Sequence, residues 1–196
     1  MDDVVKRGIR HPDALDRMCC RLVVVDLQER LLPHIESFPA VLAGCQFLIE
    51  AARLVGVPIE VSEQYPKGLG RTVSPLRELL PAAKEKSRFS AAEAFGGGLA
   101  SARADGRFQV VLIGIETHIC VLQTALDLVA AGYQVFIPVD AVGSRFAIDR
   151  DVALRRMEAA GVMLTTAESA AFEWCETAAA EPFKALSQLV KQRVRG

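Results

Sequence analysis

The sequence contains a carboxylate, an amine and a thiol at positions where they can perform nucleophilic catalysis. Asp26 directly follows the apolar run at 22–25, Lys86 lies in a polar stretch, and Cys120 comes soon after the apolar run at 107–114. A thiolate attacks carbonyl carbons, a carboxylate can remove the thiol proton, and a lysine can hold both negative groups together. These residue types indicate acyl transfer, provided that the fold brings them into contact.

Cys120 lies in the segment GIETHICVLQTALD, where Gly114 ends an apolar run and a helix must begin within a few residues. A thiol near a helix N-terminus faces unpaired N–H groups and the positive end of the dipole, which lower its pKa. The same N–H groups can stabilise an oxyanion. A small buried core cysteine is an equally good interpretation of position alone, and we prefer it for Cys19, Cys20, Cys45 and Cys175.

Asp26 and Lys86 each have an ordinary structural alternative. A carboxylate at the exit of a buried strand is a plausible base, but Asp is also a favoured helix cap. Lys86 lies in LPAAKEKSRFSAAEAF, a polar stretch before a predicted helix. A lysine there can reach into a cleft, although most lysines are solvated surface residues. Taken one at a time, neither residue establishes a site.

The loop SEQYPKGLG at 62–70 reads as a strand end followed by turn-forming residues. Gln64 and Tyr65 are the candidates in it for contact with a substrate. A plain connection is the alternative, because such loops often only join two elements.

Several other chemistries are not expected. His11, His34 and His118 have no metal-ligand spacing, so we expect no metal site, and GGG at 96–98 follows no strand, so we expect no dinucleotide cofactor. His118 is two residues from Cys120, and such positions do not face each other on a helix. A thiol redox protein is a further hypothesis, but the sequence has no CxxC pair for it.

Short apolar runs alternate with longer segments of helical period, which predicts a three-layer α/β/α domain. Strands are predicted at 22–25, 57–62, 107–114, 133–140 and 161–166. Helices are predicted at 39–56, around 124–132, and at 149–160, 167–178 and 181–194. Continuously apolar strands joined by right-handed crossovers favour a doubly wound, mostly parallel sheet of about six strands. Ligands bind such sheets at the carboxyl ends of the strands, which favours Asp26, Glu63, Gln64, the 114–120 segment and Asp140.

Length and charge restrict the partners that we expect. The 196 residues suffice for one domain at 1–196, and the net charge of −1 gives no footprint for nucleic acid or an anionic membrane. The apolar runs are shorter than the roughly 18 residues of a membrane span.

The expected location is the cytoplasm. We see no signal peptide at the N-terminus, and the five cysteines fit no disulfide framework.

Four segments resemble the isochorismatase-like cysteine hydrolases. VVVDLQERLLP is similar to the first-strand motif of that family, KSRFS to its K-x-x-F-S motif, and GIETHICVLQTALDLVAAGYQVFIPVDAVGSR to its nucleophile segment. These motifs assign the three catalytic positions to Asp26, Lys86 and Cys120. SEQYPKGLG resembles an element of the branch called isochorismatase domain-containing proteins. The resemblance spans roughly 19–170, and leaves the helix at 181–194 as an addition to the core.

The resemblance implies a Rossmann-like fold, a cis peptide between Ile115 and Glu116, and an oxyanion hole formed by the N–H groups of Glu116 and Cys120. It also implies hydrolysis of a C–N bond in a small molecule through a thioester, and a dimer or larger homo-oligomer. The nicotinamidases of the family carry a metal-binding D-x-H element where this chain has Glu63, Gln64 and Tyr65. The isochorismatases that cleave a vinyl ether lack the nucleophilic cysteine, so Cys120 argues against that reaction. A scaffold or interaction protein without turnover is the alternative function.

Overall fold

The computed structural model describes residues 10–35, 37–95 and 105–195. The glycines at 96–98, which were considered above as a nucleotide loop, lie outside the described residues.

The strands form one sheet in which every strand pair is parallel. The strands are β1 Cys20–Val25, β2 Ile59–Gln64, β3 Lys84–Lys86, β4 Gln109–Ile115, β5 Gln134–Pro138, β6 Val142–Gly143 and β7 Met163–Thr165. Their order is β3-β2-β1-β4-β5-β7, and β6 pairs with the end of β4. The predicted doubly wound α/β fold is confirmed, with seven strands in place of about six.

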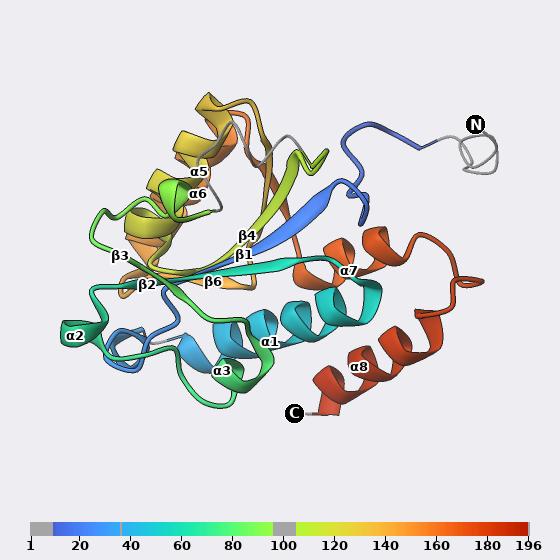
Figure 1. The fold of residues 1–196 in the computed structure, drawn as a ribbon, viewed down its shortest axis with the longest axis horizontal. Helices are drawn as coiled ribbons and strands as arrows, with labels where there is room; N and C mark the ends of the chain where they lie inside the picture. Colours follow the sequence, from blue (N-terminus) through green and yellow to red (C-terminus); the bar gives the residue numbers. More distant parts are fainter. Residues whose placement is uncertain (1–9, 36, 96–104, 196) are drawn as a thin grey trace.

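Helices cover both faces of the sheet (Figure 1). The α-helices are α1 Phe38–Val55, α2 Pro66–Leu69, α3 Leu76–Leu79, α5 Leu122–Ala130, α6 Ala147–Ala159, α7 Ala167–Cys175 and α8 Phe183–Arg195. Shorter turns are the 3-10 helices η1 Leu32–His34 and η2 Ala92–Ala94 and the π-helix η3 Thr117–Val121. Helices α1, α7 and α8 lie on one face of the sheet and α5 and α6 on the other.

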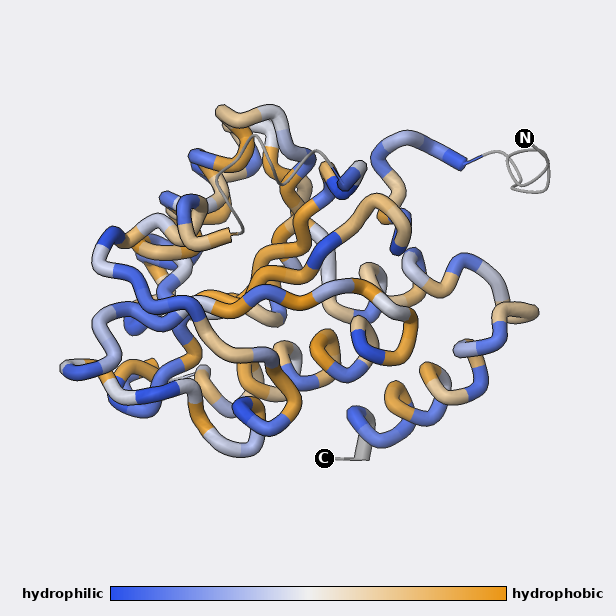
Figure 2. Tube along the Cα trace, viewed as in Figure 1, coloured by the Kyte–Doolittle hydropathy of each residue, from blue (hydrophilic) through white to orange (hydrophobic). Residues whose placement is uncertain are grey.

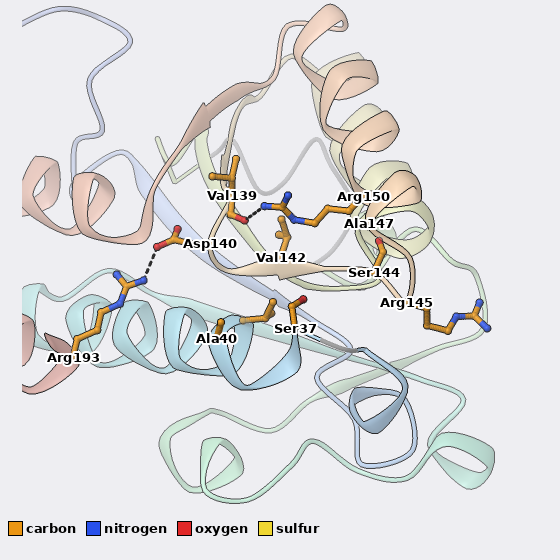
Figure 3. A pocket seen from close by; sticks show the side chains of 11 residues that line it. Ser37, Ala40, Val139, Asp140, Val142, Ser144, Arg145, Ala147, Arg150 and Arg193 are labelled. Atoms are coloured by element: carbon orange, nitrogen blue, oxygen red, sulfur yellow. Dashed lines mark hydrogen bonds and ion pairs between the residues drawn. The ribbon is translucent and has the colours of Figure 1, made fainter. Parts of the chain in front are cut away.

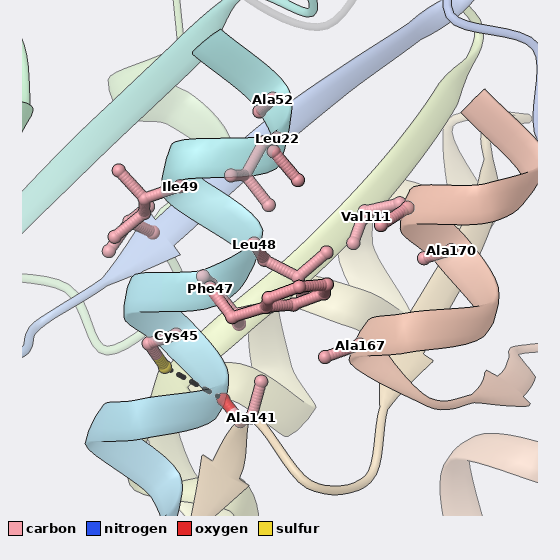
Figure 4. Close-up of a cluster of buried hydrophobic side chains, with 14 of the residues drawn as sticks. Leu22, Cys45, Phe47, Leu48, Ile49, Ala52, Val111, Ala141, Ala167 and Ala170 are labelled. Atoms are coloured by element: carbon pink, nitrogen blue, oxygen red, sulfur yellow. Dashed lines mark hydrogen bonds between the residues drawn. The ribbon is translucent and has the colours of Figure 1, made fainter. Parts of the chain in front are cut away.

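Apolar side chains fill the layers between the sheet and the helices, as the colouring of Figure 2 shows along the central strands. On the α1 face, Leu48 and Phe47 of α1 belong to the same buried cluster as Leu22 of β1 and Val111 of β4 (Figure 4). Small residues such as Ala170 on α7 complete this layer. Burial of such side chains contributes about 25 cal/mol per Å² of apolar surface and holds the helices against the sheet.

Helix α1 is the one described helix that is long and apolar enough to span a membrane by length and composition. Half of its apolar window is buried inside the protein, where α1 packs against α7, α8 and the sheet. A central core helix in a three-layer domain needs apolar residues on more than one side, which accounts for this composition.

The strand order reverses between β1 and β4, which lie side by side in the middle of the sheet. Gly114 near the end of β4 has φ 120°, and a Cβ atom there would lie 2.0 Å from the carbonyl oxygen of Val25. Only glycine permits this backbone conformation and this close approach. The carboxyl ends of β1 and β4 are therefore held together where doubly wound sheets bind ligands.

Two strand predictions need correction. The segment around Lys86 was predicted as a polar stretch before a helix, but Lys84–Lys86 forms the edge strand β3, and the 3-10 turn η2 follows within the described residues up to 95. The second strand was predicted to end at Ser62, but β2 continues to Gln64. Both differences have one cause. β2 and β3 pair with each other from Ser62–Lys84 to Gln64–Lys86, and this pairing keeps polar residues in a strand conformation.

Candidate active site

Asp26, Lys86 and Cys120 meet at the carboxyl edge of the sheet. Asp26 directly follows β1, Lys86 ends β3, and Cys120 lies on η3 just after β4. The Lys86 ammonium forms an ion pair with Asp26, with Nζ 2.7 Å from Oδ2, and the Cys120 thiol is hydrogen-bonded to both groups, which affects its pKa. The three residues are far apart in the sequence and the strand order brings them together.

Asp26 is fully buried and has an unusual backbone conformation, with φ 53°. Its carboxylate is held from two sides, because Lys86 contacts Oδ2 and the Ser62 hydroxyl donates a 2.8 Å hydrogen bond to Oδ1. Buried carboxylates need such partners, since an unpaired buried charge costs several kcal/mol. The helix-cap alternative for Asp26 does not apply, since its side chain faces Lys86 and Ser62.

Ser62 is a site residue that the sequence analysis missed. It is fully buried, and it pairs in register with Val25, the residue before Asp26. The available signal was a small polar residue directly after Val61, near the end of the predicted strand. Its use required knowing that β2 is the neighbour of β1.

Replacing Ser62 by alanine is expected to lower the free energy of unfolding by about 1.5–3 kcal/mol, the worth of a hydrogen bond to a charged group. Ser62→Thr keeps the hydroxyl and is the matched control. Urea unfolding of both variants measures the difference. Equal loss of stability in the two variants would show that the hydroxyl contributes nothing and that packing alone is affected.

Lys86 is a buried cation with several oxygen partners. Its side chain is 5% exposed, and Nζ donates to Gln64 Oε1 at 2.7 Å and to the carbonyl oxygens of Phe89 at 2.9 Å and Arg88 at 3.2 Å, besides its ion pair with Asp26. The surface-lysine alternative is therefore wrong. The carbonyl oxygens of the turn after β3 fix the ammonium beside the carboxylate.

Gln64 and Tyr65, the two candidates for contact with a substrate, differ in their surroundings. The Gln64 side chain accepts from Lys86 and donates to the carbonyl of Ser87 at 2.8 Å, so both of its polar groups have partners within the protein. Gln64 thus positions Lys86. Tyr65 is 59% exposed, with φ 37°, and its ring lies over Gly68 on α2, so it remains available to a ligand.

The pKa of Cys120 is opposite in direction to the prediction. Burial, followed by the negative charge of Asp26, raises the pKa of the Cys120 thiol to about 12, and the positive charge of Lys86 offsets only part of this. The predicted lowering by a helix N-terminus is wrong, because the thiol is only 6% exposed and lies next to a carboxylate. At rest, Cys120 is a protonated thiol.

The segment before Cys120 is fixed by side chains from the loop after β6. The Ile115–Glu116 peptide is cis, at the position to which the resemblance assigned one. The buried Glu116 carboxylate accepts two 3.1 Å hydrogen bonds from Arg145, one from its backbone N–H and one from Nε. His118 Nδ1 lies 3.0 Å from Ser144 Oγ. These contacts hold both ends of the turn that presents Cys120.

Comparison with known proteins identifies the family of this chain. The family model described as "Isochorismatase domain" matches residues 20–169. The chain belongs to the isochorismatase family. Isochorismatase domain-containing protein 2A of Mus musculus is 41% identical over 176 residues, which cover 88% of this chain and 83% of that protein. Isochorismatase domain-containing protein 1 of Salmo salar is 38% identical over 194 residues, 96% of this chain. This chain spans only 65% of the length of that protein.

Solved structures of the isochorismatase type superpose over most of the chain. The MAR1 ribonuclease from Caenorhabditis elegans is 37% identical with a TM-score of 0.83, covering 90% of this chain and 92% of that one. YcaC from Pseudomonas aeruginosa, with hexane-2,5-diol and covalent acrylamide, is 25% identical with a TM-score of 0.78, covering 94% and 98%. YcaC from Escherichia coli, described as an octameric hydrolase of unknown specificity, has a TM-score of 0.84 at 23% identity, covering 96% and 94%, which shows the shared fold.

Glu63 lies at the position that the resemblance to nicotinamidases compared with a metal-binding element, and its carboxylate holds the loop after β2. Its Oε1 accepts from the Thr72 N–H at 2.7 Å and the Thr72 hydroxyl at 2.8 Å, and its Oε2 accepts from Arg71 at 3.0 Å. Among the described residues, no group of three or more His, Cys, Asp or Glu side chains is placed to hold a metal ion. Glu63 therefore has a structural role in the loop that follows β2.

Stability at acid pH should depend on Glu63. Burial disfavours the ionised form, but hydrogen bonds from Thr72 and Arg71 outweigh it and lower the pKa of Glu63 below its usual value. The unfolded chain then binds the proton more readily, so this contribution is present above the unfolded pKa of roughly 4.3 and is lost as pH falls through the folded value. Glu63→Gln should remove that part of the pH dependence in urea midpoints measured from pH 3 to 7. An unchanged slope against the wild type would contradict this.

Proposed function

We propose that this chain is a cysteine hydrolase that cleaves the C–N bond of a small amide-type substrate through a thioester on Cys120. The observation that carries the proposal is the buried Asp26–Lys86 ion pair beside the Cys120 thiol, at the reversal of strand order. A nucleophile with a base at hydrogen-bonding reach, and a third group that orients the base, is the arrangement that covalent hydrolysis requires.

The raised pKa of Cys120 determines how the first step proceeds. Since the thiol is protonated at rest, Asp26 takes its proton as Sγ attacks the substrate carbonyl carbon. The backbone N–H groups of Glu116 and Cys120 would hold the resulting oxyanion. Until Asp26 takes the thiol proton, the positive charge of Lys86 balances the negative charge of the Asp26 carboxylate.

The remaining steps return every group to its starting state. Protonated Asp26 gives its proton to the leaving amine as the C–N bond breaks, which leaves a thioester on Cys120. Water then attacks the thioester carbon while Asp26 accepts a proton from it, and the C–S bond breaks. The carboxylic acid leaves, and the proton on Asp26 returns to the Cys120 sulfur.

Two observations on relatives bear on the substrate. The P. aeruginosa YcaC structure contains covalent acrylamide. Acrylamide is a small amide whose alkene alkylates thiols, so a reagent of this size is a suitable probe for Cys120. The C. elegans relative is described as a ribonuclease, so RNA cleavage is a second candidate function. A net charge of −1, however, gives no electrostatic attraction to RNA.

We further propose a cytoplasmic location and a homo-oligomer of two or more chains.

The test is to incubate the protein with a panel of small amides and nitriles and to search for acyl adducts by peptide mass spectrometry. The expected result is an adduct on Cys120 and release of ammonia or amine, both absent in Cys120→Ser. The same preparations are offered single-stranded RNA. Cleavage of RNA that requires Cys120, without turnover of any amide, would replace the proposal by the ribonuclease function. Absence of both activities would favour a scaffold protein.

A further inference from the structure

A cavity of about 410 Å³ lies at the carboxyl edge of β5 and β6, and Cys120 is not among its lining residues. Its walls come from the start of α1, the β5–β6 connection, the start of α6 and the end of α8 (Figure 3). Its polar lining residues are Ser37, Asp140, Ser144, Arg145, Arg150 and Arg193. The volume is within the range of small-molecule sites.

The charges on the cavity wall are unbalanced, with three guanidinium groups against one carboxylate. Arg193 is neutralised by Asp140, with Nη2 2.6 Å from Oδ2, and stacks over the Phe47 ring. Arg145 is paired with Glu116 and, in Figure 3, points away from the other cationic groups.

Arg150 is different, because its carboxylate partner Asp151 is an exposed side chain that does not line the cavity. Its Nη2 donates to the Val139 carbonyl at 2.5 Å, and Nη1 is 3.3 Å from Asp151, a carboxylate that is 57% exposed. An exposed ion pair of this kind contributes little in water. Arg150 therefore brings positive charge to the cavity wall.

Two helices begin at the same cavity and add to its positive potential. Ser37 is the N-cap of α1 and Ala147 is the first residue of α6, and neither helix has a side-chain hydrogen bond at its cap. Helix α1 has no acidic residue in its first turn, whereas α6 has Asp149 there. At the start of α1 the Phe38 N–H donates to the Ile35 carbonyl and Pro39 has no N–H, so this end favours an anion mainly through the helix dipole.

We propose that this cavity binds a small molecule through an oxyanion group, a carboxylate or a phosphate, placed between Arg150 and the first turns of α1 and α6. The apolar side chains of Val41 and Val142, which also line the cavity, would contact the rest of the ligand. Asp26, Lys86 and Cys120 do not line the cavity, so a binding test does not depend on the proposed reaction, although Ser144 and Arg145 of its wall also contact the segment before Cys120.

The experiment is calorimetric titration of the full chain with inorganic phosphate and with succinate, each in a buffer free of both. Saturable binding of at least one anion is expected, with Arg150→Gln weakening it at least about tenfold, since charge-assisted hydrogen bonds are the strong ones. Arg155→Gln, an exposed position on the same helix, is the matched control and should bind as the wild type does. Preference between the two anions identifies the phosphate or the carboxylate as the ligand group.

Ser37→Asp provides a second test that should not harm folding, because Asp is a favoured N-cap. Its carboxylate would occupy the anion position at the start of α1 and should abolish binding of the added anion. Lack of saturable binding by the wild type would overturn the proposal. Equal weakening by Arg150→Gln and Arg155→Gln, or unchanged binding by Ser37→Asp, would also overturn it.

Discussion

Replacing Asp26 by asparagine is expected to reduce amide turnover by about 10²–10⁴-fold, the usual contribution of a general base, while Cys120 reacts faster with iodoacetamide. The two effects go in opposite directions because Asp26 has two roles. In the proposed reaction it accepts the proton of the thiol, and at rest its charge and hydrogen bond raise the pKa of the Cys120 thiol. Once the carboxylate is replaced by a neutral amide, Lys86 remains and favours the thiolate.

The size of the second effect follows from the thiolate fraction. Well below the pKa, each unit by which it falls gives about tenfold more thiolate and a correspondingly faster alkylation. Peptide mass spectrometry after timed alkylation at pH 7 to 9 reports Cys120 separately from Cys20 and Cys45, whose pKa values are raised by burial. Asp151→Asn, at an exposed carboxylate on α6, is the control and should change neither quantity. Slower alkylation of Cys120 in Asp26→Asn would show that Asp26 activates the resting thiol, against this account.

Replacing Lys86 by methionine is expected to lower the free energy of unfolding by about 3–5 kcal/mol, because it leaves a buried carboxylate without its cation. Methionine has nearly the length of lysine, so the change removes charge and hydrogen bonds with little loss of volume. Gln64 Oε1 and the Phe89 carbonyl lose their donor at the same time. Turnover should be lost as well, since Asp26 would no longer be held beside Cys120.

Lys84→Met is the matched control for this measurement. Lys84 lies on the same strand, two residues away, but its side chain is 43% exposed and its partner is Glu60 at 3.0 Å. Surface ion pairs are worth about 0–1 kcal/mol, so urea unfolding should show a small change. If both substitutions lowered the free energy of unfolding by similar amounts, the lysines would stabilise the pairing of β3 with β2, and the buried ion pair would contribute no more than the exposed one.

The sequence contained the information for the sheet and for two of the three site residues. Asp26 follows a fully buried strand, and Cys120 follows another, so apolar runs and their ends were enough to place both at one edge. Lys86 was placed only by resemblance, because its strand is three residues long, charged and mostly exposed. Periodicity cannot detect such an element, since its position depends on pairing with β2.

The electrostatics of the site could not be predicted from position along the chain. The direction of the Cys120 pKa depends on how deeply the thiol is buried and on the neighbouring Asp26, both of which are tertiary features. The roles of Ser62 and Gln64 likewise depend on register between adjacent strands. The cavity beside Arg150 is formed by three segments that are remote in sequence, at 37–41, at 139–150 and at Arg193.

The place of Lys86 on β3 links the proposed reaction to resistance against aggregation. β3 is the last strand on its side of the sheet, and such an edge can recruit a strand from another molecule. Its residues Lys84, Glu85 and Lys86 are all charged, which is one of the ways in which natural sheets protect an open edge. An apolar substitution in this strand would therefore do more than weaken the fold or the reaction, because it would also make the edge more adhesive toward other chains. The three residues of β3 therefore serve both the solubility of the protein and the proposed reaction.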